Sequence, residues 1–360
     1  MLNICLSFDY ELFLGKNFLS ADDTLFAPTN EIINILHSAG VSGTFFADVC
    51  SVFQHEKFKK LDYSKKFTEQ LQDMVRHEQD VQLHIHTNWL LSSPDGNNGN
   101  GWDISTDGYK IHDIEADSSG CETMDSVIKR GKEYLCNTLI PVYPDYKCIA
   151  YRAGGFCVQP EGELFQVLLN NGIVIDSSVA PKLKDKLYDF KNAPAMPGWS
   201  VAPEAGLDKV STDADGCIYE VPIGTIRNNI FRFAKYPINT WHVKGNSGRG
   251  QCIKRDAGSK ANFLINMVKL IYRRSFGYGI LSLDSRGYRI LLEDLQGLYR
   301  KWECDKHDAV ICIICHPKLA SGHTLDNMKH FIMEVGKREE FFHFVTLRDV
   351  YNDVVGKAEK

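Results

Sequence analysis

Short apolar runs rich in β-branched residues alternate with helical patterns along most of the 360-residue chain. A continuous apolar run is typical of a strand buried on both faces of a parallel sheet, and a helix is the usual crossover between two such strands. About seven or eight such steps follow one another, which predicts a parallel barrel or a doubly wound sheet. The expected strands span residues 2–8, 43–47, 81–86, 148–152, 173–176, 217–221, 309–315 and 342–347.

Helical patterns fill most of the intervals, at residues 29–39, 64–78, 123–139, 160–172 and 326–335. Two longer intervals break the alternation. Residues 91–122 are rich in Gly, Asn, Asp and Ser and are expected to form a long loop, whereas residues 227–303 contain amphipathic helical patterns near 261–272 and 288–302. We expect a single domain, 1–360, that carries both intervals as insertions.

Charge and hydropathy exclude several functional classes. The 41 basic and 46 acidic residues give a net charge of −5, so no basic surplus points to nucleic acid. The longest clean apolar run, residues 309–315, is far shorter than the ~20 residues of a transmembrane helix. No charged leader with an apolar stretch precedes the first strand, and we therefore expect a cytoplasmic protein without a transmembrane segment.

Polar side chains follow several expected strands at the point where each strand ends. In parallel barrels the chemistry collects at the carboxyl ends of the strands, so these side chains are expected to meet at one rim. The two histidines of a His-x-His segment share one strand face, a spacing that suits a divalent metal. The residues at these strand ends are Asp9, Glu11, His84, His86, Arg152, Asp176 and His316.

Five segments that contain these residues resemble, in order and approximate spacing, the motifs of the polysaccharide deacetylase family (NodB-homology, family 4 carbohydrate esterases). The resemblance covers residues 4 to about 349 apart from the two insertions, and it implies a distorted (β/α)7–8 barrel. It also implies a divalent metal, usually zinc, that is used to hydrolyse N- or O-acetyl groups on sugars. The segments are Ser7-Phe8-Asp9-Tyr10-Glu11, Asp80-Val81-Gln82-Leu83-His84-Ile85-His86, Tyr151-Arg152-Ala153-Gly154-Gly155-Phe156, Asp176-Ser177-Ser178-Val179 and Cys315-His316-Pro317.

The resemblance implies a role for each matched residue. Asp9 matches the general base of the family, and Arg152 matches the arginine that orients this base. Glu11 matches the metal carboxylate in the D-x-D/E form of the first motif, and His84 matches the first metal histidine. His316 matches the histidine that acts as general acid.

Two positions depart from the family pattern. Tyr10 stands where the commonest first motif has the metal-binding aspartate, and Asn88 stands where the family has its second metal histidine. Because His86 lies on the same strand face as His84, we expect it to replace that histidine as a ligand. Aromatic rings near the strand ends can stack on a sugar, and the candidate substrate contacts are Asn88, Trp89, Tyr151 and Asp176.

The predicted function is removal of an acyl group from a sugar or sugar conjugate, with a cytoplasmic precursor of a surface polysaccharide as the expected substrate. Two alternatives stay open. Asn88 in place of a histidine favours a catalytically inactive carbohydrate-binding relative. The run from His84 to Thr87 also resembles the opening motif of metal-dependent phosphoesterases, although at least two strands precede it here.

Overall fold

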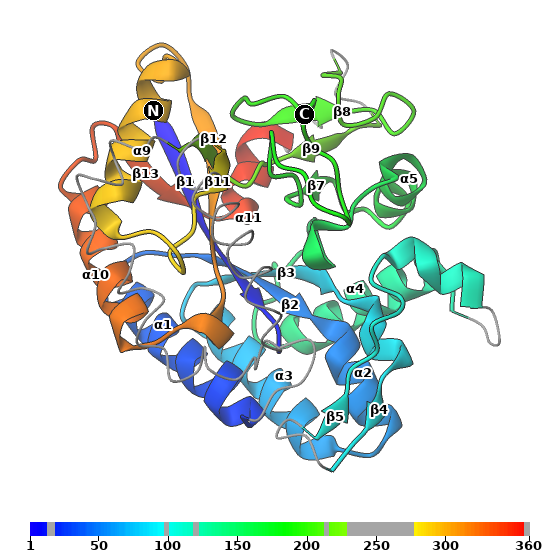
Figure 1. Cartoon of the computed structure of the whole chain (residues 1–360). Helices are drawn as coiled ribbons and strands as arrows, with labels where there is room; N and C mark the ends of the chain where they lie inside the picture. Colours follow the sequence, from blue (N-terminus) through cyan, green and yellow to red (C-terminus); the bar gives the residue numbers. More distant parts are fainter. Residues whose placement is uncertain (13–18, 97–100, 118–121, 212–215, 229–276, 356–360) are drawn as a thin grey trace, which may run out of the picture.

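The computed structural model describes residues 1–12, 19–96, 101–117, 122–211, 216–228 and 277–355. A curled sheet lies at its centre (Figure 1). Neighbouring strands follow the order β12, β1, β2, β3, β6, β7, β9, β8, and each adjacent pair is parallel except β9 and β8. The strands are β1 (Leu2–Tyr10), β2 (Thr44–Asp48), β3 (Asp80–Ile85), β6 (Ala150–Ala153), β7 (Ile175–Asp176), β8 (Trp199–Val201), β9 (Ile218–Glu220) and β12 (Ala309–Cys315).

The sheet closes on itself just after β9. Ile223 forms a parallel bridge with Cys312 of β12, and the Gly224 N–H donates to the Cys312 carbonyl at 2.8 Å. A doubly wound sheet would stay open, so the closure confirms the predicted distorted β/α barrel. The expected strand at 342–347 is β13 (Phe342–Val345), which pairs with the first half of β1 and lies outside the ring.

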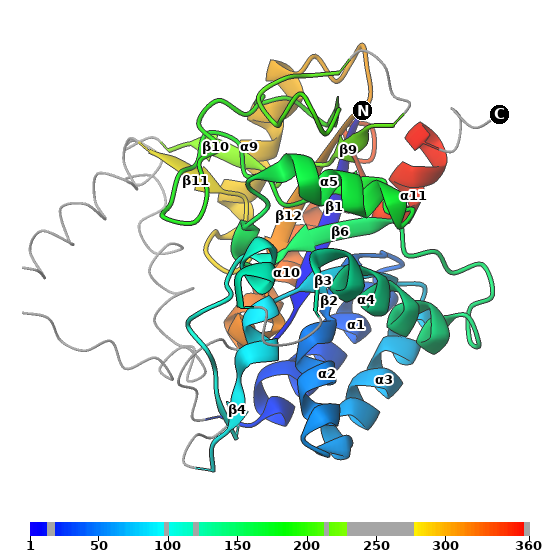
Figure 2. The same ribbon diagram turned by 90° about the vertical axis from the view of Figure 1, so that its right-hand side faces the viewer.

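Helices surround the barrel on its outer face (Figures 1 and 2). In α3, an apolar stripe at helical spacing, which includes Phe67, Leu71 and Met74, is buried. A capping box of Thr123 and Ser126 begins α4. No helix in the described ranges is long and apolar enough to cross a membrane. The helices are α1 (Ala27–Ser38), α2 (Val49–Lys57), α3 (Leu61–Arg76), α4 (Met124–Leu139), α5 (Glu161–Asn170), α9 (Tyr288–Lys301), α10 (Gly322–Gly336) and α11 (Leu347–Val350).

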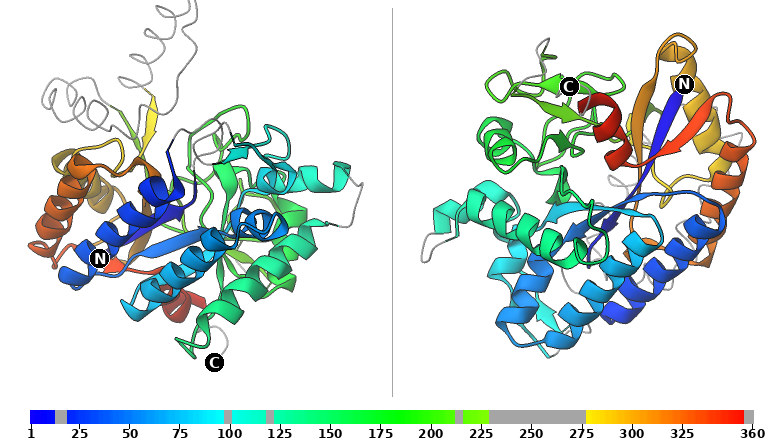
Figure 3. Two further views of the ribbon diagram at one scale, coloured as in Figure 1. Left: turned by 90° about the horizontal axis from the view of Figure 1, so that it is seen from below. Right: turned by 180° about the vertical axis from the view of Figure 1, so that it is seen from behind.

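Two runs of helices around the barrel are in contact: α9 with α10 and α10 with α1, and separately α2 with α3, α3 with α4 and α4 with α5 (Figure 3). Short helical segments lie between or after these longer elements. They are η1 (Asp22–Phe26), η2 (Thr87–Leu91), η3 (Ile111–Asp117), η4 (Gly154–Phe156), η6 (Pro317–Leu319) and η7 (Tyr351–Val355).

The two intervals expected as insertions contain more order than the sequence indicated. The interval 91–122 holds a small hairpin of β4 (Ser93–Pro94) and β5 (Trp102–Asp103), followed by η3. In the interval 227–303, the helix expected near 288–302 is α9, and β11 (Tyr278–Ile280) pairs with β10 (Thr225–Arg227). The helix expected near 261–272 lies outside the described residues.

The barrel interior has a small apolar cluster of its own, separate from the larger core between sheet and helices. Cys5 of β1 and Phe46 of β2 belong to it. Side chains alternate along a strand, so residues two, four and six positions after Cys5 face the same interior. These are Ser7, Asp9 and Glu11.

Strand register brings further charged residues to the same level of the barrel. Asp48, two positions after Phe46, is paired with His84 of β3, and His84 is paired with Arg152 of β6. All three side chains are buried. The carboxyl end of the barrel therefore gathers charged groups above an apolar floor.

Candidate active site

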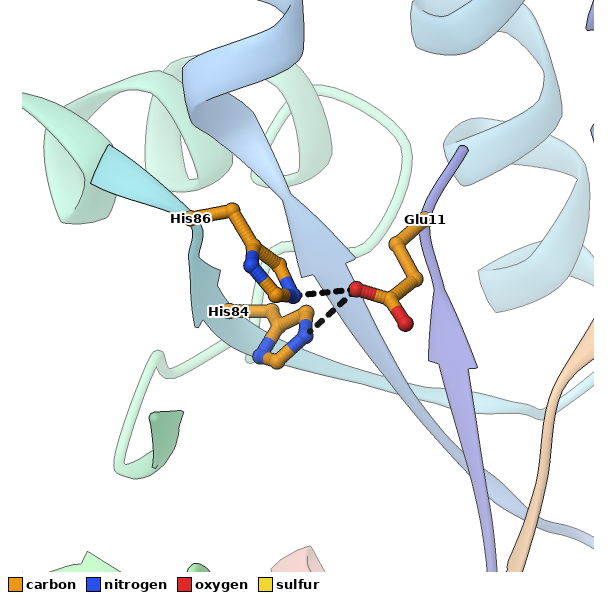
Figure 4. Close-up of side chains that lie close together, drawn as sticks. All are labelled: Glu11, His84 and His86. Carbon is orange, nitrogen blue, oxygen red and sulfur yellow. Dashed lines mark hydrogen bonds and ion pairs between the residues drawn. The ribbon is translucent and has the colours of Figure 1, made fainter. Parts of the chain in front are cut away.

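Glu11, His84 and His86 converge at the carboxyl ends of β1 and β3 (Figure 4). His84 Nε2 lies 3.3 Å from Glu11 Oε2, and His86 Nε2 points at the same oxygen. One ligand atom from each residue lies within 4.8 Å of the others, and all three residues are buried. The three residues predicted to hold a metal are thus brought together.

The hydrogen bonds around Glu11, His84 and His86 favour the binding of a cation between them. His84 Nδ1 lies 2.7 Å from the Arg152 carbonyl, so that nitrogen carries the proton and Nε2 presents a lone pair to Glu11 in the neutral ring. His86 Nε2 faces Glu11 Oε2, and His86 Nδ1 has no hydrogen-bond partner in the described part of the chain. An imidazole lone pair and a carboxylate oxygen repel each other unless a proton or metal ion lies between them, so the donor set fits a divalent metal.

The charge states in this group follow from its surroundings. Burial opposes ionisation of Glu11, but the ammonium of Lys318 and the imidazole of His86 hold its pKa well below the usual range. Burial likewise disfavours the charged form of His84, yet the hydrogen bond with Glu11 and the charge of Asp9 raise its pKa overall. Glu11 is therefore a carboxylate that attracts cations.

Gly154 permits the position of His86. A Cβ at residue 154 would lie 2.6 Å from both His86 Nδ1 and the Ile85 carbonyl oxygen, closer than side chains approach one another. The glycine that follows Arg152-Ala153 is thus required because the imidazole packs directly on the backbone.

Arg152 is fully buried and holds Asp9. Its guanidinium donates to Asp9 Oδ1 at 2.6 Å and to Ser7 Oγ at 3.0 Å, and it also donates to the carbonyl and hydroxyl of Ser177 at 2.7 and 2.9 Å. Burial tends to raise the pKa of Asp9, but Arg152 and His316 outweigh burial and lower it. The structure therefore joins the predicted pair and keeps Asp9 ionised.

His316 faces Asp9 from the end of β12. Its Nε2 lies 3.5 Å from Asp9 Oδ2, and its side chain is 20% exposed, more than those of Asp9 and Glu11. Nδ1 lies 2.8 Å from Asp284 Oδ2, and the His316 backbone N–H donates to Asp284 Oδ1. Burial alone would lower the pKa of His316, but Asp284 and Asp9 raise it. The neighbouring Cys315 belongs to the core between sheet and helices, on the opposite face.

The sequence analysis missed Asp284, Lys318 and Asp48. Asp284 ends a short segment in which Ser282 forms a parallel bridge with Ile314 of β12. Asp284 is therefore another polar residue at the carboxyl end of a strand-like segment. Asp48 ends β2 in the same way; its Oδ1 accepts from the His86 N–H, and burial raises its pKa to about 6. Lys318 follows β12 in η6, and no pattern in the sequence marks it.

The predicted substrate contacts Trp89 and Tyr151 are covered. Trp89 has no exposed surface and packs against His55 and Trp102. Tyr151 alternates with Arg152, so it faces the helices and is 1% exposed. Neither ring presents a face on which a sugar could stack, and the stacking interpretation is corrected accordingly.

Asn88 and Asp176 are also buried without surface for a substrate. Asn88 Nδ2 donates to the Ser105 carbonyl at 3.3 Å, and its buried Oδ1 has no hydrogen-bond partner among the described residues. Asp176 accepts hydrogen bonds from the backbone and hydroxyl of Ser178 and faces the carboxyl of Glu220. Their contacts are those of residues that hold loops in place.

No protein-family model matches the chain, and no curated protein matches it. A structure described as a polysaccharide deacetylase from Mycobacterium smegmatis is 12% identical, with a TM-score of 0.47 over 99% of this chain and 91% of that chain. One from Pseudomonas aeruginosa PAO1, described in the same way, is 10% identical, with a TM-score of 0.45 over 98% of this chain and 91% of that chain. Puue allantoinase is 10% identical, with a TM-score of 0.45 over 98% of this chain and 88% of that chain. Polysaccharide deacetylases are therefore among the solved structures similar to this chain, and they are also the family that its five sequence motifs resemble.

Proposed function

We propose that this protein is a divalent-metal-dependent hydrolase that removes an acyl group from a sugar or sugar conjugate. The observation that carries the proposal is the junction of two groups at Glu11. The metal-binding group of Glu11, His84 and His86 adjoins the pair formed by Asp9 and His316. Hydrolysis of an amide or ester needs an electrophile, a base and an acid in one place, and this junction supplies all three.

Glu11, His84 and His86 are the residues that would hold the ion. Two imidazoles and one carboxylate form a donor set typical of catalytic zinc, which keeps one position open. When bound, such an ion polarises an acyl carbonyl and makes water more acidic. In this proposal His86 replaces the family histidine whose position is taken by Asn88.

Asp9 is the proposed general base. It is ionised, and its Oδ2 is directed towards His316 while Oδ1 is bound by Arg152. The base takes a proton from water as the water oxygen bonds to the acyl carbon. Arg152 positions Asp9 through one hydrogen bond from Nη1 to Oδ1, and three further buried hydrogen bonds to Ser7 and Ser177 fix its guanidinium.

His316 is the proposed general acid. As the bond from the acyl carbon to the sugar oxygen or nitrogen breaks, His316 Nε2 gives its proton to the leaving alkoxide or amine. Asp284 holds Nδ1 and so fixes the ring with Nε2 towards the site. The products are a carboxylic acid and a free hydroxyl or amino group on the sugar.

An acylated sugar as substrate is supported by the resemblance of the five motifs. Whether the acyl group is N- or O-linked is left open by these residues, because His316 can protonate either leaving group. A precursor of surface polysaccharide and a cytoplasmic location stay predictions from the sequence.

Acetate release from N- and O-acetylated sugars, measured with and without added Zn²⁺, tests the proposal together with metal content. Glu11→Gln and His84→Ala should each lower bound metal and cut acetate release by roughly 10²-fold or more. Exposed residues distant from the site, Glu31 and His343, offer matched controls as Glu31→Gln and His343→Ala. Unchanged metal content in both site variants would refute the assignment of the ligands.

The same assays distinguish the two alternatives. Phosphate release from a phosphorylated sugar, with no acetate release, would support a phosphoesterase. Sugar binding without any product in the presence of metal would support a carbohydrate-binding protein. Either result would overturn the proposed reaction.

A further inference from the structure

The two oxygens of Glu11 face different groups. Oε2 faces the imidazoles of His84 and His86, whereas Oε1 faces His316 Nε2 at 3.8 Å. Asp9 Oδ2 lies 3.5 Å from the same imidazole nitrogen. A second potential metal-binding group, Asp9, Glu11 and His316, therefore adjoins the first and shares Glu11 with it.

A carboxylate that bridges two such groups is the usual arrangement of centres with two metal ions, in which the ions lie about 3.5–4 Å apart. Taken by its ligands alone, this site could accept two ions. The chain itself supplies a cation at the second position: Lys318 Nζ lies 2.5 Å from Glu11 Oε1, and its side chain is only 13% exposed.

We propose that the ammonium of Lys318 takes the place of a second divalent ion and restricts the centre to one metal. This inference rests on the metal site of the proposed function. Lys318 bonds to Oε1, so Glu11 presents Oε2 alone to His84 and His86. An ammonium brings one positive charge where a divalent ion would bring two, and it has no open coordination position for water.

The charges around the second group agree with this role. Asp9 Oδ1 is already neutralised by Arg152, which leaves Asp9 Oδ2 and Glu11 Oε1 towards His316. With Lys318 also present, a divalent ion there would face two fixed cations within one small, buried group. Removing the lysine leaves two carboxylate oxygens and one imidazole without that repulsion. Lys318 is thus a positioning residue that acts through Glu11.

Lys318 reaches Glu11 because the chain turns sharply after β12. Pro317 begins η6, and from this turn the lysine side chain reaches the end of the neighbouring strand β1. A further contact of Nζ with the Leu12 carbonyl, at 3.5 Å, holds the ammonium beside the strand end. The ammonium is therefore held by the Glu11 carboxylate and by the carbonyl of the next residue, Leu12.

The test is metal stoichiometry. Apoprotein is titrated with Zn²⁺ and, separately, with Mn²⁺, and bound metal is counted per chain after removal of free ions. Wild type should bind one ion, whereas Lys318→Met should bind a second one at the same free metal concentration. Electron paramagnetic resonance of the Mn²⁺-loaded variant should show the exchange coupling of a carboxylate-bridged pair, and wild type should not.

Lys318→Arg should keep one ion, because it restores the charge, and Lys329→Met on the surface of α10 is the matched control. A second bound ion in wild type, or one uncoupled ion in Lys318→Met, would overturn the inference and leave the proposed hydrolase intact. If the wild-type protein binds no metal at all, both this inference and the proposed metal-dependent hydrolase are refuted. Thermal melting of each apoprotein verifies that the variants are folded before titration.

Discussion

Replacing Arg152 with Met should destabilise the protein strongly, even though Arg152 is assigned a role in the active site. Methionine keeps an apolar stem where the guanidinium now lies 4.1 Å from the Phe46 ring centre, so little volume is lost. The Asp9 carboxylate, which is 4% exposed, would instead lose its partner. The change therefore isolates the charge and hydrogen bonds of Arg152 from its bulk.

The size of the stability loss follows from the burial of the ion pair between Arg152 and Asp9. Removing one member of a buried ion pair costs about 3–5 kcal/mol, because the remaining charge stays in a medium of low polarity. The hydroxyls of Ser7 and Ser177 also lose a donor. For a chain of this length the loss corresponds to a fall in Tm of about 4–7 °C.

Urea unfolding and thermal melting of four proteins test this reasoning: wild type, Arg152→Met, Asp9→Asn and the double variant. Because Asp9→Asn removes the unpaired charge, the double variant should recover a large part of the stability that Arg152→Met loses. A loss below about 1 kcal/mol in Arg152→Met would refute the argument. So would a double variant that is no more stable than Arg152→Met.

Three further predictions concern other parts of the site and its support. Gly154→Ala should displace the adjacent imidazole and weaken metal affinity roughly tenfold in a Zn²⁺ titration, whereas Gly322→Ala, where no atom lies within 4 Å, should not. Asp284→Asn should slow hydrolysis of substrates with poor leaving groups by roughly 10²-fold and spare activated esters, because His316 then loses its orienting carboxylate. Burial and a neighbouring carboxyl raise the pKa of Glu220 well above 4.5, so the folded state keeps a proton that the unfolded chain releases. The free energy of unfolding of the protein should therefore fall by about 1.4 kcal/mol per pH unit above pH 4.5 until Glu220 ionises. Glu220→Gln should flatten this slope, as measured by urea unfolding at pH 5 and 8.

Much of the barrel can be predicted from sequence because its strands are buried on both faces and therefore read as apolar runs. The same rule places Asp9, His84, Arg152 and His316 at strand ends, and alternation explains why they face the interior. Alternation also excludes Tyr151 from that interior, since it precedes Arg152 by one residue.

Other features depend on contacts between distant segments. Trp89 is buried because the hairpin of β4 and β5 places Trp102 against it, and no local pattern indicates that packing. Asp284 reaches His316 through a bridge between residues 32 positions apart. Lys318 meets Glu11 across 307 positions, because β12 and β1 lie side by side in the sheet.

The two departures from the deacetylase motifs have one geometric explanation. In β1 only every second residue faces the barrel interior, and Tyr10 accordingly points outward, where its hydroxyl donates to Gln70 Oε1 at 2.6 Å. A carboxylate two residues after Asp9 still reaches the barrel interior, and Glu11 occupies that position just beyond β1, where its N–H donates to the Asp9 carbonyl at 3.0 Å. A histidine two residues after His84 keeps to the inward face of β3 in the same way. Both changes set two site residues at a spacing of two, Glu11 after Asp9 and His86 after His84, and all four belong to the two adjoining groups that could bind a metal. The position four residues after His84 is then free for Asn88 to hold the following loop through Ser105. Tyr10 and Asn88 thus leave the barrel interior to Glu11 and His86, which together with His84 form a group that could hold a metal ion.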